Sequence, residues 1–244
     1  SDDMAAFANG LKEMGIDNLR ILMGSDGKRG VKTKVEPTLQ EAPGVYNDTI
    51  LAGLDYLLME MDKRKMVAVL YLNNSWEWSG GYGYYLEQAG LGKAPRPDED
   101  GYPAFMNFVA QYASCDKAHQ LFYDYVRFIL TRTNRYTKKK YKDDPAIMSW
   151  QIGNEPRAFS KEQLPAFEKW LGETSKLIRS LDKNHLISIG SEGKWGCENE
   201  LDCWERICAD RNVDYCNIHL WPYNWSWARK DHLLEDLGVS CKNT

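Results

Sequence analysis

The feature that most constrains the fold is a regular alternation between short, almost continuous apolar runs and longer segments with helical periodicity. Five apolar runs occur, at residues 18–23, 66–72, 146–152, 185–189 and 214–220. Strands that are apolar on both faces are typical of parallel sheets that helices cover. The alternation therefore predicts an α/β fold with right-handed crossovers, either a (β/α)8 TIM barrel or a doubly wound open sheet.

Helical patterns separate the apolar runs. Apolar residues at three- and four-residue spacing predict helices at 4–14, 49–65, 117–133 and 160–181, with a further short helix at 231–237. Ser160 and Gln163 have the spacing of a capping box, so we expect them to cap the last long helix. No glycine-rich phosphate loop follows any apolar run, which counts against a nucleotide-binding open sheet.

Polar and aromatic residues collect where the apolar runs end, whereas ordinary turn residues such as 142–145 precede them. In a barrel, the chemistry lies at the carboxyl ends of the strands. Six of the nine tryptophans also lie in these segments. The residues concerned include Asn74, Trp76, Asn154, Glu155, Glu192, Trp195, His219, Trp221 and Trp225. This polarity favours the barrel and predicts a cleft at one edge of the sheet.

Composition excludes several classes of function. The 35 acidic and 31 basic side chains leave no clustered positive charge of the kind that binds nucleic acid. No stretch of 18 apolar residues could span a membrane. The six cysteines are not spaced as zinc ligands, so they form one to three disulfides or remain buried thiols, and both alternatives stay open. We therefore expect neither a nucleic-acid partner nor a membrane span.

The sharpest local motif is Gly153-Asn154-Glu155-Pro156, directly after the third apolar run. A glutamate at a strand end can protonate a leaving oxygen while the neighbouring amide holds a sugar hydroxyl. The alternative is that Asn-Glu-Pro only shapes a turn. Alternatives also stay open for Arg20, as a structural ion pair, for His219, as a core histidine, and for Glu192, as support for its loop.

Taken together, the strand ends make the chain resemble glycoside hydrolase family 5, and within it the endo-β-1,4-mannanases. The segments that carry the resemblance are 19–21, 73–76, 150–156, Gly193 with Trp195, and 219–222. The family implies a (β/α)8 barrel and a retaining mechanism with two glutamates and no cofactor. It also implies that β-mannan, as mannan, glucomannan or galactomannan, is the substrate.

The resemblance implies a role for each matching residue. Glu155 would be the acid/base with a raised pKa, Asn154 would hold the sugar 2-hydroxyl, and Arg20 and His219 would support the catalytic carboxylates. The residues expected to contact the substrate are Trp76, Asn74, Glu192, Trp195, Trp221 and Trp225. One departure from the family is Trp221, which stands where the family usually has a tyrosine that bonds the nucleophile.

The family pattern places the five apolar runs as barrel strands two to six. We therefore expect residues 1–244 to be one catalytic domain that is incomplete at both ends, with the nucleophile glutamate beyond Thr244 and this chain inactive alone. A barrel that binds carbohydrate without catalysis and an endo-β-1,4-glucanase are the alternatives. Because intact polysaccharides cannot enter the cytoplasm, we expect the protein to be secreted, periplasmic or held at the cell surface. We also expect a monomer.

Overall fold

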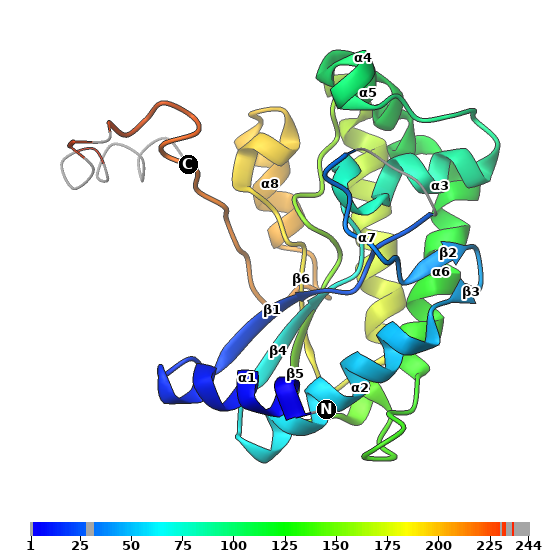
Figure 1. The fold of residues 1–244 in the computed structure, drawn as a ribbon. Helices are drawn as coiled ribbons and strands as arrows, with labels where there is room; N and C mark the ends of the chain where they lie inside the picture. Colours follow the sequence, from blue (N-terminus) through cyan, green and yellow to red (C-terminus); the bar gives the residue numbers. More distant parts are fainter. Residues whose placement is uncertain (1, 28–31, 230, 233–235, 237–244) are drawn as a thin grey trace.

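A computed structural model describes residues 2–27, 32–229, 231–232 and 236, and its centre is a four-stranded parallel sheet (Figure 1). The strands are β1 (Asn18–Leu22), β4 (Val67–Tyr71), β5 (Ile147–Gln151) and β6 (Leu186–Ser188), hydrogen-bonded in the order β1-β4-β5-β6. The spatial order follows the chain order, as in a barrel rather than a doubly wound sheet. The predicted α/β architecture and four of the five predicted strands are therefore confirmed.

The predicted long helices are also confirmed, with small changes at their ends. They are α1 (Asp2–Glu13), α2 (Asp48–Lys63), α6 (Asp116–Thr131) and α7 (Leu164–Leu181). Figure 1 shows α2, α6 and α7 together on one face of the sheet. Fully buried side chains from both layers, such as Leu58, Trp150 and Trp170, fill the space between them. The core therefore lies between the sheet and its helices.

Helix α7 does not begin as expected. Ser160 Oγ donates to the Glu162 carboxylate instead of capping the helix, so the predicted capping box is wrong. A 3-10 turn, η4 (Lys161–Gln163), comes first, and α7 begins at Leu164 with Pro165 in its first turn. Proline suits this position because the first amide groups of a helix have no intrahelical acceptor.

The predicted strand at 214–220 is not formed. This segment lies beside β6, but most of the contacts use side chains in place of a backbone ladder. The Asp214 carboxylate accepts a hydrogen bond from the Ile187 amide, and the Asp214 backbone amide donates to the Ile187 carbonyl. Further along, Asn217 accepts from the Gly190 amide and donates to the Ser191 carbonyl. A regular ladder is missing because Asp and Asn side chains satisfy the polar groups that a strand would pair.

Several elements were not predicted. A hairpin of β2 (Gln40–Ala42) and β3 (Val45–Tyr46) follows β1, and α8 (Leu201–Cys208) follows β6. Between β4 and α6 the chain forms α3 (Gly81–Ala89), α4 (Pro97–Asp100) and α5 (Tyr102–Val109). The 3-10 turns are η1 (Glu77–Ser79), η2 (Ala110–Ser114), η3 (Tyr141–Asp143) and η5 (Gly193–Cys197). Most of the helix expected at 231–237 lies outside the described residues.

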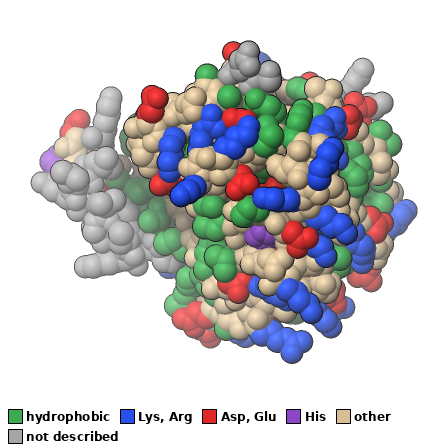
Figure 2. Space-filling model, turned by 90° about the horizontal axis from the view of Figure 1, so that it is seen from below, with side chains coloured by type: hydrophobic (Ala, Val, Ile, Leu, Met, Phe, Trp, Pro, Cys, Tyr) green, Lys and Arg blue, Asp and Glu red, His purple; other side chains and the backbone are tan. Residues whose placement is uncertain are grey.

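Both expectations for the cysteines hold. A disulfide between Cys208 and Cys216 ties the end of α8 to the 214–220 segment. Cys197 and Cys203 are buried thiols, and Cys115 is a partly buried one. Cys241 lies outside the described residues. Within the described part of the chain, no helix is both long and apolar enough to cross a bilayer. Figure 2 shows Lys and Arg side chains interspersed with Asp and Glu over the face seen from below.

Candidate active site

Glu155 is held at the carboxyl end of β5 in an unusual backbone conformation. Its φ of 49° lies in the left-handed region, which is uncommon for residues other than glycine. Two hydrogen bonds fix this conformation. The Glu155 amide donates to the Gly190 carbonyl, and the Glu155 carbonyl accepts from Ser75 Oγ. Backbone strain of this kind persists only where the surroundings enforce it, and it clusters at functional sites.

Three side chains from two other segments, the loop after β4 and the end of the 214–220 segment, meet at the carboxylate of Glu155. Trp76 Nε1 donates to Oε2 at 2.7 Å, and Trp221 Nε1 donates to Oε1 at 3.2 Å. His219 Nδ1 lies 2.8 Å from the same Oε1. Glu155 itself is buried at 9% exposure. The fold therefore brings Glu155, His219, Trp76 and Trp221 together, although these residues are up to 145 positions apart in the sequence.

Among the described residues this environment lowers the pKa of Glu155, and the raised pKa that the resemblance implies for the complete enzyme stays a prediction. Burial alone would raise the pKa, because it disfavours the charged carboxylate. The hydrogen bonds from His219, Trp221 and Trp76, and the charge of His219, outweigh burial. The two indole donors could not be foreseen from the sequence, because they reach Glu155 from other segments of the chain.

Asn154 and Arg20 form a layer beside Glu155. Arg20 Nη1 donates to Asn154 Oδ1 at 3.1 Å, and Arg20 Nε donates to Gln151 Oε1 at 2.7 Å. The Arg20 guanidinium also lies 4.1 Å from the centre of the Tyr71 ring. Arg20 is therefore oriented by neutral partners, and it forms no ion pair with any residue that the structure describes. Its charge remains available to a carboxylate or a ligand near Asn154.

Asn74 is fully buried, and its side chain is occupied by its own loop. Its Nδ2 donates to Ser79 Oγ, and its Oδ1 accepts from the Trp76 amide and from Asn154 Nδ2. The structure thus places Asn74 behind Trp76 and Asn154, where it positions both. A direct contact between Asn74 and the substrate stays a prediction.

Glu192 forms an ion pair with Arg157, a residue that the sequence reasoning missed. The Glu192 Oε1 atom lies 2.7 Å from Arg157 Nε and 2.5 Å from Nη2. The Arg157 guanidinium lies 5.2 Å from the centre of the Trp76 ring. Burial raises the pKa of Glu192 and outweighs the positive charge of Arg157, which lowers it. The negative charge of Glu155 raises the pKa of Glu192 further. Arg157 could have been found by its position, two residues after Glu155 in the same motif.

The remaining predicted tryptophan residues form an aromatic cluster with Trp227. The ring centres of Trp195 and Trp225 lie 6.2 Å apart. The ring centre of Trp227 lies 6.3 Å from that of Trp195 and 4.6 Å from that of Trp225. Trp221 is 50% exposed and Trp195 is 36% exposed, so both present ring surface to solvent. Flat exposed rings beside a carboxylate suit the apolar faces of sugar rings. Within the described ranges no cluster of three or more His, Cys, Asp or Glu side chains could hold a metal ion.

This geometry belongs to a known class. A family model described as GH family 5 beta-mannosidase-like matches residues 4–244, so the chain belongs to glycoside hydrolase family 5. Solved structures agree in fold: the family 5 mannosidase from Rhizomucor miehei is 34% identical with a TM-score of 0.82, over 92% of this chain and 53% of that one. A mutant of a Rhizomucor miehei family 5 mannosidase was solved with mannosyl-fructose. It has a TM-score of 0.85 at 32% identity, over 98% of this chain and 57% of that one.

Curated relatives point to the same family. Mannan endo-1,4-beta-mannosidase 4 of Oryza sativa subsp. japonica is 32% identical over 203 residues, which are 78% of this chain and 42% of the relative. The enzyme of the same name from Solanum lycopersicum is 33% identical over 199 residues, 77% and 47% respectively. The chain spans less than half the length of these relatives. The predicted resemblance and the (β/α)8-barrel fold class are confirmed.

Proposed function

We propose that the protein is a retaining glycoside hydrolase that cleaves the backbone of β-1,4-mannans, with Glu155 as the acid/base. The observation that carries the proposal is the set of three N–H groups, from Trp76, Trp221 and His219, converging on the Glu155 carboxylate at a strand end. A carboxylate fixed in this way at the carboxyl edge of a barrel is placed for proton transfer to a bound sugar. The relatives named mannan endo-1,4-beta-mannosidase supply the substrate class.

In this mechanism Glu155 acts twice. It first protonates the glycosidic oxygen, while a glutamate outside the described residues attacks the anomeric carbon, and it then deprotonates the attacking water. A nucleophile about 5–5.5 Å away would raise the pKa of Glu155 by repulsion, and that repulsion ends once the nucleophile is esterified. The three N–H donors then favour the ionised Glu155 that the second step requires.

Replacing Glu155 by glutamine tests the assignment. Glu155→Gln, in a protein with every residue that its gene encodes, should lower kcat on unactivated mannan by about 10²- to 10⁴-fold. Aryl β-mannosides with acidic leaving groups should lose far less in the first step, because their leaving group needs no proton. Glu162→Gln, at an exposed position of η4, is the matched control and should keep full activity. Full activity of Glu155→Gln on unactivated mannan would overturn the proposal.

A second candidate is an exo-acting β-mannosidase. It is favoured by the family model, described as beta-mannosidase-like, and by the Rhizomucor miehei structures named mannosidase at 32–34% identity. Analysis of early products from mannohexaose separates the two. Internal cleavage to mannobiose and mannotriose supports the endo activity that we propose, whereas stepwise release of mannose from one end supports the exo activity.

The substrate, location and assembly belong to the same proposal. Parallel assays on mannan, glucomannan, xylan and carboxymethyl-cellulose would expose an endo-β-1,4-glucanase, and binding without turnover would indicate a non-catalytic barrel. We also propose that the protein is monomeric and acts outside the cytoplasm, where intact polysaccharides occur. Light scattering of the purified protein and fractionation of the source cells test these two points.

A further inference from the structure

The orientation of the Trp76 indole is not fixed by its own backbone. The Trp76 amide donates to Asn74 Oδ1 at 3.1 Å, and its Nε1 donates to Glu155 Oε2 at 2.7 Å. Two side-chain torsions separate these two groups, and the residue is only half-buried, so the ring can turn unless other side chains pack against it. The residues that pack on the ring therefore decide whether its N–H reaches Glu155.

Three side chains enclose the Trp76 ring. The Phe159 ring meets it edge to face, with 5.4 Å between the ring centres and 88° between the planes. The Tyr102 ring lies at 6.3 Å and 81°, and the Arg157 guanidinium lies 5.2 Å from the centre of the Trp76 ring. Edge-to-face contacts are favoured between aromatic rings, because the positive edge of one ring meets the negative face of the other. Of the two aromatic contacts, the one with Phe159 is the shorter.

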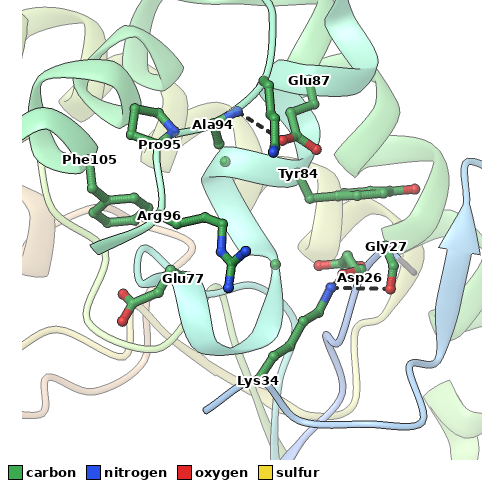
Figure 3. A pocket seen from close by; sticks show the side chains of 13 residues that line it. Asp26, Gly27, Lys34, Glu77, Tyr84, Glu87, Ala94, Pro95, Arg96 and Phe105 are labelled. Carbon is green, nitrogen blue, oxygen red and sulfur yellow. Dashed lines mark hydrogen bonds between the residues drawn. The ribbon is translucent and has the colours of Figure 1, made fainter. Parts of the chain in front are cut away.

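Phe159 is itself held by the core. Its ring centre lies 6.4 Å from that of Tyr82 and 6.5 Å from that of Phe105, and both of these residues are fully buried. Tyr82 belongs to α3 and Phe105 to α5, and residues of both helices also form the wall of the cavity shown in Figure 3. Phe159 therefore connects Trp76 to side chains that close packing already fixes.

The backbone of Phe159 is strained. Its φ of 60° lies in the left-handed region, where a bulky side chain is an outlier and glycine would cost less. The preceding residue, Ala158, is fully buried, and its amide donates to the Gly196 carbonyl at 3.1 Å. Strain of this kind persists only where the surroundings enforce it, and it clusters at functional sites. The chain thus carries a large ring where the backbone alone favours a smaller residue.

We propose that Phe159 is a positioning residue whose ring holds the Trp76 indole in the orientation in which Nε1–H donates to Glu155. The inference rests on the proposed function, in which this donor favours the ionised Glu155 that the second step requires. The side chain of Phe159 has neither a charge nor a hydrogen-bonding group. It can therefore act on Glu155 only through the side chains that it contacts.

Other groups near Glu155 also influence its protonation, so the test must separate them from Trp76. The charged or titratable groups that face Glu155 or Phe159 are His219, Arg20, Glu192 and Arg157. A displacement of any of them would change the pH profile without a change at Trp76. A double-mutant cycle distinguishes the routes, because two substitutions that act on one contact do not add.

Phe159→Leu removes the ring but keeps apolar bulk. In a protein with every residue that its gene encodes, it should move the alkaline limb of kcat/KM on mannan to higher pH, as Trp76→Phe should. The shift should be smaller, because the indole donor is loosened rather than removed. In a protein that already carries Trp76→Phe, the same substitution should move the limb no further. Phe128→Leu, at a half-buried phenylalanine of α6 stacked on Tyr46, is the matched control and should leave the limb in place.

The indole N–H resonance of Trp76 gives a readout that needs no hydrolysis. It is identified in isotope-labelled protein by its absence in Trp76→Phe. Phe159→Leu should move this resonance and speed the exchange of its proton with water roughly two- to tenfold, the effect of losing one aromatic contact. Phe128→Leu should do neither. Should Phe159→Leu fail to fold, Phe159→Met fills the space with a flexible chain and carries the same expectations.

Three results would each overturn the inference in a protein that hydrolyses mannan. They are an unmoved indole resonance in Phe159→Leu, an unmoved alkaline limb in that variant, and a limb shift that persists when Trp76 has already been replaced. If the unaltered protein hydrolyses no mannan, the proposed function fails. The indole resonance then still shows whether Phe159 orients Trp76, so the two failures are distinguishable.

Discussion

At the scale of single residues, the hydrogen bonds to Glu155 decide when it carries its proton. Trp76→Phe keeps an aromatic ring but removes the 2.7 Å donor to Oε2. Because that donor stabilises the charged carboxylate, its loss should raise the pKa of Glu155. The alkaline limb of the pH profile of kcat/KM, which reports the acid of the free enzyme, should therefore move to higher pH.

Trp221→Phe is the matched comparison, since its indole donates to the other oxygen at the longer distance of 3.2 Å. It should move the alkaline limb in the same direction, because the Trp221 hydrogen bond also lowers the pKa of Glu155. An unchanged limb in both variants, or a shift to lower pH in Trp76→Phe, would show that these indoles do not set the protonation of Glu155.

The sequence located these catalytic candidates but not how they are arranged. Glu155 and His219 could be predicted because each lies at or near the end of an apolar run, and strand order alone brings such residues to one edge. The burial of Asn74 and the pairing of Glu192 with Arg157 could not be predicted, because they depend on side-chain packing between loops. The lowered pKa of Glu155 depends on the same loops.

At the scale of elements, the turn after β6 is where the backbone is most crowded. Gly190 has a φ of 82°, and a Cβ there would lie 1.8 Å from the Gly153 carbonyl oxygen. Gly190→Ala should therefore lower the free energy of unfolding by about 3 kcal/mol or more, since both strain and overlap act together. It should also lower activity, because the Gly190 carbonyl accepts from the Glu155 amide.

Gly44→Ala is the matched control for this turn. Gly44 has a similar φ of 76°, but a Cβ there meets nothing within 4 Å. Gly44→Ala should lower the free energy of unfolding by about 1 kcal/mol, which is the strain of the left-handed region alone, and it should leave activity unchanged. Denaturant unfolding of both variants measures the difference, and equal losses would mean that the contact with Gly153 is relieved by a backbone shift.

The elements also show where periodicity stops being informative. Helices α2 and α6 could be predicted to within two residues because their apolar faces are long and regular. The α3–α5 region could not, because its helices are short and are interrupted by Gly90, Gly92 and Gly101. The 214–220 segment has the composition of a strand, yet side-chain hydrogen bonds of Asp214 and Asn217 replace the ladder.

For the whole molecule, a buried ionic network anchors α2 to the segment after α6. Asp55 is fully buried and accepts from Arg132 at 2.7 Å, from Tyr141 at 2.5 Å and from Arg135 at 3.2 Å. Asp55→Asn should lower the free energy of unfolding by about 3–5 kcal/mol, because it leaves Arg132 partly buried without its charge partner. Asp124→Asn, which breaks an exposed pair with Arg127, should cost no more than about 1 kcal/mol. Thermal unfolding of the two variants makes the comparison, and similar losses would contradict the argument.

Asp55 and Asp26 should give the molecule opposite responses to pH. Burial would raise the pKa of Asp55, but hydrogen bonds from Arg132 and Tyr141 lower it overall, so its contribution to stability is lost as pH falls below the ordinary value of 3.8. Burial raises the pKa of Asp26 to about 7, although hydrogen bonds from Gln40 and Gly81 act to lower it. The contribution of Asp26 is therefore complete below 3.8 and is lost as pH rises towards and through about 7.

Stability should consequently be greatest in the mildly acidic range between these two transitions. Asp26→Asn removes the titrating group. The fall in the free energy of unfolding between about pH 4 and pH 7 should therefore flatten in this variant. At about pH 4 the variant should still be less stable than the unaltered protein. Denaturant unfolding at intervals from pH 3 to pH 8 follows both limbs. A decline of the same slope in the variant would mean that other groups release the protons, and a stability that rises from pH 5 to pH 7 in the unaltered protein would show that Asp26 is already ionised in the fold.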